Sequence, residues 1–391
     1  MHNNIINNLL NLKGVNVKNI KNVGDYVEVF INTKVKPHNC PVCNNITTKI
    51  HDYRKQVIKD IPIQLTPTYL IFNKRRYVCK HCHKKFYEKL EFLPKYHRTT
   101  SRLNSYIIDS LKDIVNMKYV GKNVNVSPST VCNRFDLVEY LKPKYLPEVL
   151  SIDEFKGNTN NTKYQCILVD AKNHRIIDIL PDRKQTVLID YFKSFKNRDS
   201  VKYFVIDMWK PYADIGRTYF KNALIIADKY HYVRQNIWAF EKIRKREQKR
   251  LGKHSKKLFR NSRRILLSKP NKLSDDDKMK LNSILAYSED LRQAYYLKQL
   301  FFEFSDSSSY DQAKKNLIDF ILIAQNSGIT EYINLAKTLT NWSEEILNSF
   351  KVPYTNGCTE GFNNKIKVLK RIAFGFRNFK TFRNRILHCC S

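Results

Sequence analysis

The sequence predicts a multidomain protein of mixed α+β and α/β class. Strand-like runs lie in the first 90 residues, and helical patterns fill most of the last 160. Between residues 149 and 227, three strand patterns in succession are followed by alternating helices and strands, which indicates a mixed sheet with helices on its faces. A chain of 391 residues is long enough for two or three domains with their own cores.

The charge of the chain indicates a polyanionic partner. It contains 70 Lys and Arg residues against 36 Asp and Glu, a formal net charge of +34. Nucleic acid is the partner that such an excess favours. A coding bias toward Lys is the alternative, but it does not explain why acidic residues are so few.

Nothing in the sequence indicates a membrane-spanning or secreted protein. No apolar run reaches the roughly 18 residues that cross a bilayer. The first residues, Met1 to Ile5, lack the charged region and cleavage site of a signal peptide. We therefore expect a cytoplasmic protein that associates with the nucleoid. In that reducing compartment, the nine cysteines favour metal binding or free thiols over disulfides.

Two CxxC pairs predict a zinc-binding β domain with one structural Zn²⁺. Each pair presents two thiolates, and together they complete a closed tetrahedral site. The expected ligands are Cys40, Cys43, Cys79 and Cys82. Unpaired thiols are the alternative, and three histidines are near enough to replace a cysteine: His38, His81 and His83. Basic and aromatic residues around the second pair suit phosphate contact or an ordinary solvated face, and among them we expect Arg75 and Arg76 to contact DNA.

Residues 99–145 predict a helix-turn-helix. Apolar residues from Leu103 to Val115 recur at helical spacing, and Ser127-Pro128 is a good start for a later helix. In a helix-turn-helix this last helix enters the major groove. The side chains expected to contact DNA are Ser129, Thr130, Asn133 and Arg134. A plain helical bundle is the alternative, which the positive charge disfavours.

The order of elements after residue 148 predicts a ribonuclease H-like catalytic core. Strands are expected at 149–155, 164–170, 174–180, 202–207 and 223–227, with helices at 185–195 and 212–220. The first and fourth strands end on Asp153 and Asp207, and in this fold those strands are neighbours. An apolar strand that ends on a carboxylate positions a metal ligand. Either aspartate alone could merely cap its strand, but two in succession favour a metal site.

An all-helical insertion is expected between the two parts of this core. Between Glu241 and Arg260 there are ten Lys or Arg against two Glu, which suits a solvated helix or a phosphate-tracking surface. Beyond the insertion, Glu360 falls near the start of a helix, with Asn363, Asn364 and Lys367 on its face. The tail interleaves basic and aromatic residues, so we expect DNA contacts at Lys370, Arg371 and Arg377, with amphipathic packing as the alternative.

With these motifs in place, the chain resembles the bacterial insertion-sequence transposases of the DDE class, and among them the ISL-three family. The resemblance extends over nearly the whole chain. It rests on CPVC and CKHC, SIDEFKG at 151–157, VIDMWKPY at 205–212, ADKYHYVR at 227–234, and most specifically TNGCTEGFNNKIKVLKRIAFGFRNFKTFRNRIL at 355–387. The family usually has Phe where this chain has Tyr230.

The resemblance implies a catalytic triad and its metal ions. Asp153, Asp207 and Glu360 would hold two Mg²⁺ ions, or Mn²⁺, which activate the attacking oxygen and stabilise the leaving oxygen. Asp228 and His231, one helical turn apart, could pair, with His231 near the scissile phosphate; a helix cap with a packed histidine is the alternative. Supporting roles fall to Asp228, Asn364 and Lys367.

These observations combine into five expected segments and one expected function. The segments are 1–98 (zinc-binding), 99–145 (helix-turn-helix), 146–240 (first part of the core), 241–345 (helical insertion) and 346–391 (third carboxylate and basic-aromatic tail). The resemblance implies a transposase that binds the terminal inverted repeats of double-stranded DNA, cleaves the element ends and joins them to target DNA, as a homodimer or larger assembly. The alternatives are a ribonuclease H-like nuclease without strand transfer, and a non-enzymatic DNA-binding regulator, which would need no third carboxylate.

Overall fold

The computed structural model describes residues 10–12, 14–250, 259 and 262–390, which form two compact units. Unit 1 holds the described residues up to 140, with 366–376 and 380–390; unit 2 holds those of 141–365, with 377–379. Our expectations for the first five residues and for much of the basic run before Arg260 lie outside the described residues. Within the described part, no helix is long and apolar enough to cross a membrane.

Unit 1 begins with a five-stranded sheet in the order β1-β2-β6-β5, in which β7 also pairs with β6. The strands β2 (Val27–Thr33) and β6 (Thr66–Val78) are parallel and contain the two strand-like runs that the sequence predicted. The remaining strands are β1 (Val15–Asn22), β5 (Ile50–Ile63) and β7 (Lys85–Tyr87), with the short pair β3 (His38–Asn39) and β4 (Ile46–Thr47). Apolar residues of four strands form one core, which includes Val17, Val29, Ile58 and Leu70.

Three helices follow the sheet and share a separate apolar core. They are α2 (Ser101–Ser110), α3 (Met117–Asn123) and α4 (Pro128–Phe135). The predicted start of the last helix is confirmed, because Ser127 Oγ accepts a hydrogen bond from the Thr130 N–H at 3.2 Å. Gly121 allows the backbones to approach here, since a Cβ at that position would lie 2.7 Å from the Val126 carbonyl oxygen.

A fourth helix, α16 (Phe379–Cys390), contacts this three-helix group. Arg385 is 1% exposed, and its guanidinium donates hydrogen bonds to the carbonyl oxygens of Leu111, Asp113 and Val115. The carbonyls at the end of a helix have no partner within it, so Arg385 satisfies acceptors just beyond α2. The helix α2 ends at Ser110, before the end of the apolar pattern that predicted it.

Unit 2 is built on a five-stranded sheet in the order β10-β9-β8-β11-β12. The strands β8 (Val149–Thr159), β9 (Thr162–Asp170) and β10 (Arg175–Leu180) form an antiparallel meander. The strands β11 (Tyr203–Ile206) and β12 (Leu224–Ala227) run parallel to β8. All five predicted strands are confirmed, and so is the pairing of the first with the fourth.

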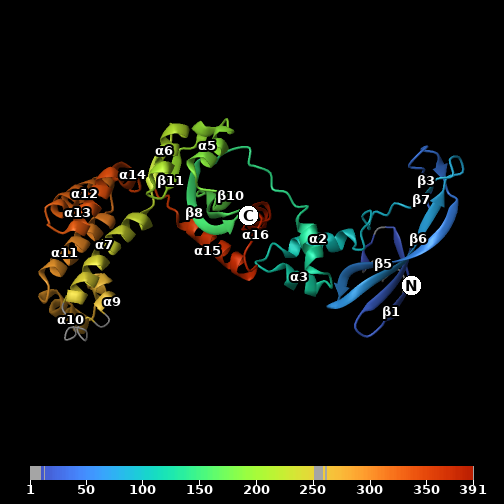
Figure 1. Ribbon diagram of the computed structural model, residues 1–391, viewed down its shortest axis with the longest axis horizontal. Helices are drawn as coiled ribbons and strands as arrows, with labels where there is room; N and C mark the ends of the chain where they lie inside the picture. The colour runs from blue at the N-terminus through green and yellow to red at the C-terminus, as the bar shows by residue number, and fades with distance from the viewer. Residues whose placement is uncertain (1–9, 13, 251–258, 260–261, 391) are drawn as a thin grey trace. The chain divides into compact units, whose positions relative to one another are not determined.

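Helices cover both faces of this sheet (Figure 1). On one face, Leu150, Ile152 and Phe204 pack against α5 (Gln185–Lys193) and α6 (Lys210–Tyr219). On the other face, Val149, Val205 and Ile226 pack against Val352, Tyr354 and Cys358, the last of which lies in α15 (Gly357–Ile372). Side chains alternate along a strand, so this second face also receives Ser151 and Asp153.

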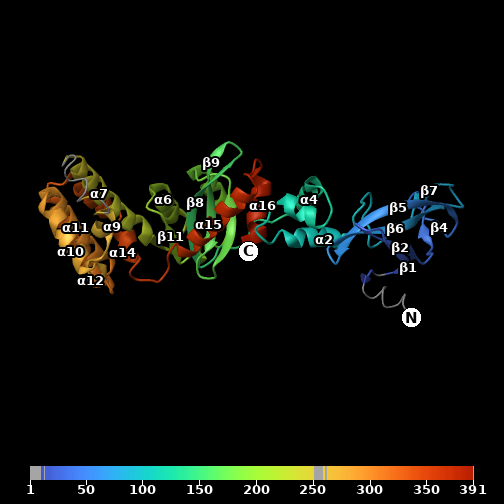
Figure 2. The ribbon, with the colours of Figure 1, turned by 90° about the horizontal axis from the view of Figure 1, so that it is seen from below.

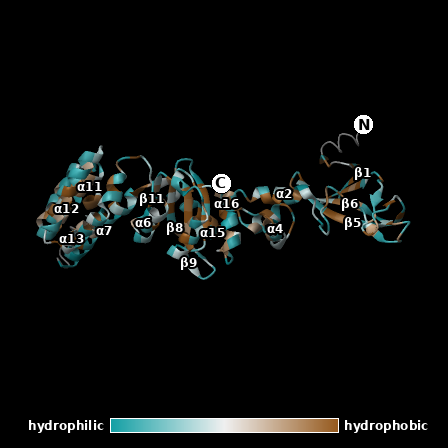
Figure 3. Ribbon diagram, turned by 90° about the horizontal axis from the view of Figure 1, so that it is seen from above, coloured by the Kyte–Doolittle hydropathy of each residue, from teal (hydrophilic) through white to brown (hydrophobic). Residues whose placement is uncertain are grey.

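The described part of the segment between β12 and α15 is helical, as the sequence predicted, and forms one bundle (Figure 2). Its helices are α7 (Lys229–Arg250), α9 (Ser262–Leu267), α10 (Asp275–Ala286), α11 (Glu289–Ser305), α12 (Tyr310–Gln325), α13 (Thr330–Asn341) and α14 (Ser343–Asn348), with a short 3₁₀ turn at Pro270–Lys272. Outside the bundle, a second 3₁₀ turn at Arg198–Ser200 lies between α5 and β11. Aromatic residues such as Tyr232, Phe301 and Phe320 fill its core. The central strands are brown in Figure 3, whereas the helices of this bundle carry teal on much of their surface.

Candidate active site

Three aspartates lie at the same level on three neighbouring strands. Asp207 and Asp228 directly follow β11 and β12, whereas β8 does not end on Asp153, as the sequence predicted, but continues to Thr159. Val205 of β11 lies opposite Ser151 of β8, and Ile206 lies opposite Ala227 of β12. Because parallel strands keep their register, Asp207 follows beside both Asp153 and Asp228. Alternation places all three carboxylates on the face of the sheet that α15 covers.

Asp153 and Asp207 interact directly. Burial, then the charge of Asp207 and a hydrogen bond between the two side chains, raise the pKa of Asp153 to about 8, although the Glu154 N–H donates to its Oδ1 at 2.6 Å. Two carboxylates this close resist ionising together unless a cation offsets the second charge. The pair is therefore the kind of hard oxygen donor set that a divalent cation fits.

His231 contacts this pair from the first turn of α7. Its Nε2 lies 2.9 Å from Asp207 Oδ1. Burial acts to lower the pKa of His231, but the hydrogen bond and charge of Asp207 outweigh it, so the pKa is raised. The sequence suggested that His231 could pair with Asp228; instead its side chain meets Asp207, because only its backbone N–H reaches the Asp228 carbonyl oxygen, at 3.1 Å.

Asn356, just before α15, forms hydrogen bonds to side chains on β8 and directly after β11 and β12. Its backbone N–H donates to Asp228 Oδ1 at 3.1 Å, and its side-chain Nδ2 donates to Asp207 Oδ1 at 3.3 Å. Its Oδ1 accepts from Ser151 Oγ, which also lies 2.8 Å from Thr359 Oγ1. The pKa of Asp228 is raised, chiefly by burial. Asn356 was not among the predicted site residues; the signal for it was an Asn directly before a helix start, which is a common cap.

Asn363, two turns into α15, holds the other aspartate. Its Nδ2 donates to Asp153 Oδ2 at 2.7 Å. Its Oδ1 is buried and has no hydrogen-bond partner in the described structure. An amide oxygen left over beside two close carboxylates is a further acceptor that a cation would satisfy. The sequence placed Asn363 on this helix face but gave it no role.

Glu360 lies in the first turn of α15, as expected, but its side chain is exposed. Among the residues that the structure describes, the one set of three or more Cys, His, Asp or Glu with ligand atoms within 4.8 Å of one another is the four N-terminal cysteines. The structure therefore brings Asp153 and Asp207 together without gathering Glu360 at that distance. Asn364 and Lys367 lie exposed further along α15.

The four cysteines of unit 1 form the second candidate centre. Their Sγ atoms lie 3.4 Å apart between Cys40 and Cys82 and 3.5 Å apart between Cys43 and Cys79. Four thiolates at ~2.3 Å from one zinc ion stand roughly 3.8 Å apart, so the set fits Zn²⁺. The ligand set is all cysteine: the open alternative, a histidine ligand, does not occur in this group.

The backbone and the thiol chemistry of this centre both suit a metal. Asn44 and His83 each follow a CxxC pair with positive φ, and the N–H of each donates to the carbonyl oxygen of the first cysteine of its pair. A hydrogen bond from the Asn45 backbone lowers the pKa of Cys43 to about 6. The Lys84 backbone acts to lower the pKa of Cys82, but burial and the neighbouring thiols raise it to about 12. A cation removes this conflict between adjacent thiolates.

The residues expected to contact DNA differ in how they are held. Arg75 is 7% exposed, and its guanidinium binds Glu88 Oε2 at 3.0 Å, so it is no longer a candidate DNA contact. Arg76 lies on the opposite face of β6, 3.4 Å from Asp52 and over the ring of Tyr87. Of the four α4 residues expected to contact DNA, Ser129 and Asn133 are exposed. The other two have partners: the Thr130 hydroxyl bonds to Ser127, and Arg134 Nε donates to Asn104 Oδ1 at 2.9 Å. In and after α15, Arg371 and Arg377 are exposed and Lys370 is half-buried.

The basic run at the end of α7 is partly neutralised within the bundle. Arg244 is 7% exposed and bonds Glu241 at 2.7 Å, and Arg246 bonds Glu331 at 2.9 Å.

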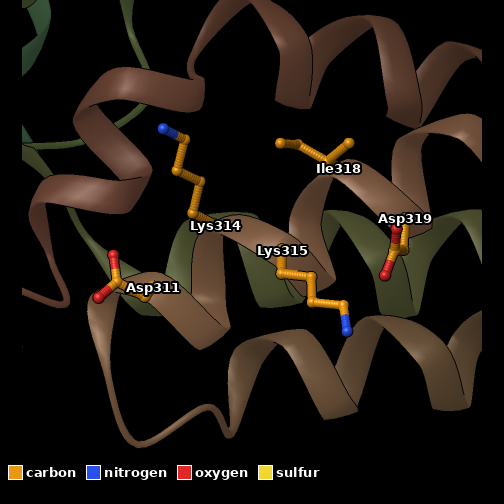
Figure 4. A pocket seen from close by; sticks show the side chains of 5 residues that line it. All are labelled: Asp311, Lys314, Lys315, Ile318 and Asp319. Carbon is orange, nitrogen blue, oxygen red and sulfur yellow. The ribbon is translucent and has the colours of Figure 1, made fainter.

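The open surface of α12 carries a shallow hollow of about 280 Å³, lined by Asp311, Lys314, Lys315, Ile318 and Asp319 (Figure 4). Its two lysines point in different directions, and none of its residues belongs to either centre.

Fold and site together define a class of protein that pairs two carboxylates on neighbouring parallel strands and carries a four-cysteine centre in its N-terminal unit. Comparison with known families identifies that class. A family model described as "Transposase", of the DDE type and the ISL3 group, matches residues 150–386. A second, described as the zinc-finger of transposase IS204/IS1001/IS1096/IS1165, matches residues 36–82. The chain belongs to the ISL3 transposase family, and the resemblance seen in its motifs is confirmed.

Two transposases align with more than half of the chain. The chain is 24% identical to the transposase for insertion sequence element IS1001 of Bordetella parapertussis, over 92% of this chain and 90% of that protein. It is 24% identical to the transposase for insertion sequence element IS1557 of Mycobacterium tuberculosis, over 59% of this chain and 57% of that protein. A shorter match, 33% identical over 107 residues, is to a Lactococcus lactis protein named ATP-dependent protease.

Proposed function

We propose that this transposase binds the terminal inverted repeats of an insertion sequence, cleaves at the element ends and joins the freed 3′-hydroxyl to target DNA. The observation that supports this best is the half-buried pair of Asp153 and Asp207, side by side on the parallel strands β8 and β11. The strand order, three antiparallel strands followed by two parallel ones, supports the proposal of a ribonuclease H-like core. Such a core positions carboxylates for phosphoryl transfer.

The residues around the pair have distinct roles in this proposal. Asp153 and Asp207 hold the divalent cation, Mg²⁺ or Mn²⁺, which when bound stabilises charge on the attacking and leaving oxygens. Asn363 and Asn356 orient the two carboxylates through their amide hydrogen bonds. His231 fixes the Asp207 oxygen that it contacts. Glu360 supplies the third carboxylate when the first turn of α15, or its side chain, moves toward the pair.

Unit 1 is the DNA-recognition unit in this proposal. Its three helices act as a helix-turn-helix, with α4 in the major groove and Asn133 toward the bases. Hydrogen bonding to Asn104 fixes the Arg134 side chain before DNA arrives. The four cysteines hold one structural zinc ion and stabilise the sheet that precedes the helices. Two element ends must be handled together, so the active form is a homodimer or larger assembly.

The test is a cleavage and joining assay on duplexes that carry the repeats flanking the coding region. Asp153→Asn and Asp207→Asn should each slow cleavage by about a thousandfold or more, a loss of roughly 4 kcal/mol of transition-state stabilisation. Both variants should still bind the duplex, and the exposed control Asp199→Asn should cleave normally. Cleavage by Asp207→Asn at the wild-type rate would refute the assignment. Cleavage without any joined product would favour the nuclease alternative.

A further inference from the structure

An aromatic-arginine stack runs along the outer face of α7. Tyr230, Arg234 and Trp238 are spaced by four residues and therefore share one face of the helix. The guanidinium carbon of Arg234 lies 5.1 Å from the Tyr230 ring centre and 4.6 Å from the Trp238 ring centre. Both aromatic residues are 54% exposed, while α7 turns other residues, such as Tyr232 and Phe240, to the bundle core. The stack is therefore not part of the core.

This stack begins at the candidate active site. Arg234 Nη2 lies 3.3 Å from His231 Nδ1, on the side of the imidazole opposite the nitrogen that meets Asp207. The Nε atom of Arg234 is buried and finds no hydrogen-bond partner within the described residues. A continuous line of contacts thus leads from Asp207 through His231 and Arg234 to the exposed indole of Trp238.

We propose that Trp238, held by Arg234, stacks an unpaired nucleobase of the DNA beside the bond that is cut. Every nucleobase offers a flat π face, and exposed aromatic rings with a neighbouring arginine bind such faces without regard to sequence. Arg234 lies over one face of the indole, and the exposed remainder is the surface that a base can cover. This inference rests on the proposed function, because it needs DNA at the Asp153–Asp207 pair.

Binding measurements without added Mg²⁺ or Mn²⁺ test the proposal without any cleavage, and no chelator is used because it would remove the structural zinc. Two fluorescent duplexes of the element end are compared, one fully paired and one with a single unpaired base at the cleavage position. Wild-type protein should bind the second more tightly, and Trp238→Ala should weaken that binding by about tenfold, the loss typical of a removed base–aromatic stack. Trp238→Phe should largely restore it. Tyr296→Ala, which removes a ring that is 56% exposed on α11, is the matched control and should bind both duplexes normally.

A 2-aminopurine at the unpaired position reports stacking directly. Its fluorescence should be quenched by wild-type protein and by Trp238→Phe, but not by Trp238→Ala. If Trp238→Ala binds and quenches like the wild type, the stack only stabilises α7 and the proposal is overturned, although the proposed function stands as long as the element ends are cleaved. If wild-type protein neither binds nor cleaves these ends, the proposed function fails and this inference fails with it.

Discussion

At the scale of single residues, two side-chain amides help to hold the carboxylates of the candidate active site. Asn363 donates to Asp153, and Asn356 donates to Asp207 and, through its backbone, to Asp228. Asn363 and the Glu154 N–H contact the two oxygens of Asp153, whereas Asn356 and His231 both contact Oδ1 of Asp207. Hydrogen bonds thus fix the side chains of Asp153 and Asp207, whereas the side chain of Glu360 is exposed.

This contrast leads to a prediction for Glu360. Glu360→Gln keeps the size of the side chain but removes its charge, so cleavage and joining should both fall by about a hundredfold or more, roughly 3 kcal/mol. Because the side chain is exposed, the melting temperature and binding to element ends should not change. Glu344→Gln, an exposed glutamate in the first turn of α14, is the control. Full activity of Glu360→Gln in Mg²⁺ would remove Glu360 from the site.

At the scale of elements, the contact between α7 and α11 contains a buried lysine. Lys298 is 0% exposed, and its Nζ, which lies 4.4 Å from the Tyr295 ring centre, has no hydrogen-bond partner in the part of the chain that is described. Burial lowers the pKa of Lys298 from 10.5 to about 8, because the charged ammonium loses its hydration. The helix pair therefore carries an electrostatic cost at neutral pH.

The direction of this pKa shift predicts how the stability of the folded protein depends on pH. Between about pH 8 and 10.5 the unfolded chain holds a proton at Lys298 that the folded protein has lost, so the stability contributed at this site rises with pH across that window. Lys298→Met should raise the free energy of unfolding at pH 7 by roughly 1–3 kcal/mol, and the gain should shrink toward zero near pH 10. Urea unfolding at both pH values measures this, with the exposed Lys337→Met as control. A gain that does not depend on pH would exclude the electrostatic cause.

The sequence predicts an element well when a few consecutive residues determine it, and poorly when distant parts of the chain must first come together. Apolar runs that end on an acid predicted β8 and β11 and their aspartates, because strand burial is written in a few consecutive residues. The contact of Ser151 with Asn356 joins residues 205 positions apart, and it depends on how α15 docks on the sheet after the helical insertion. No local pattern specifies the direction of a side-chain amide in such a contact.

The alternation of side chains along β6 was a local signal that Arg75 would be buried rather than free to contact DNA. Residues alternate between the two faces of β6, so Arg75 shares the buried face with Tyr77, while Lys74 and Arg76 lie on the other. Similarly, the count of basic residues near Glu241 did not show that Arg244 is buried against that glutamate. Net charge predicts the class of partner, but it does not say which cations remain available to it.

At the scale of the whole molecule, the zinc centre and the sheet that carries it should be lost together. Cys79→Ser removes one of four thiolates, so purified protein should lose its single zinc ion, and binding to element ends should fall with it. A zinc assay, together with hydrogen exchange across β5 and β6, checks both effects. Cys389→Ser lies in α16, outside the four-cysteine group, and should keep the metal. Active wild-type protein without zinc would contradict the centre.

The net charge of +34 predicts a steep dependence of DNA binding on salt. Each phosphate that is neutralised releases counterions, so a protein with 6–10 phosphate contacts loses about 10³–10⁵ in affinity between 50 and 200 mM salt. Titration of element-end and random duplexes over this range should give similar slopes, with tighter binding to the element end throughout. A slope near zero would show that the positive charge is not used on DNA.

The return of the chain to unit 1 has a consequence for partial copies of the protein. A ribosome completes unit 2 before it releases α16, and until then the carbonyls beyond α2 lack the Arg385 guanidinium. A polypeptide stopped early by a nonsense codon inside the helical bundle therefore leaves its three-helix group unfinished. We expect such fragments to be poor competitors for the element ends, so damaged gene copies would not silence an intact one by blocking its sites.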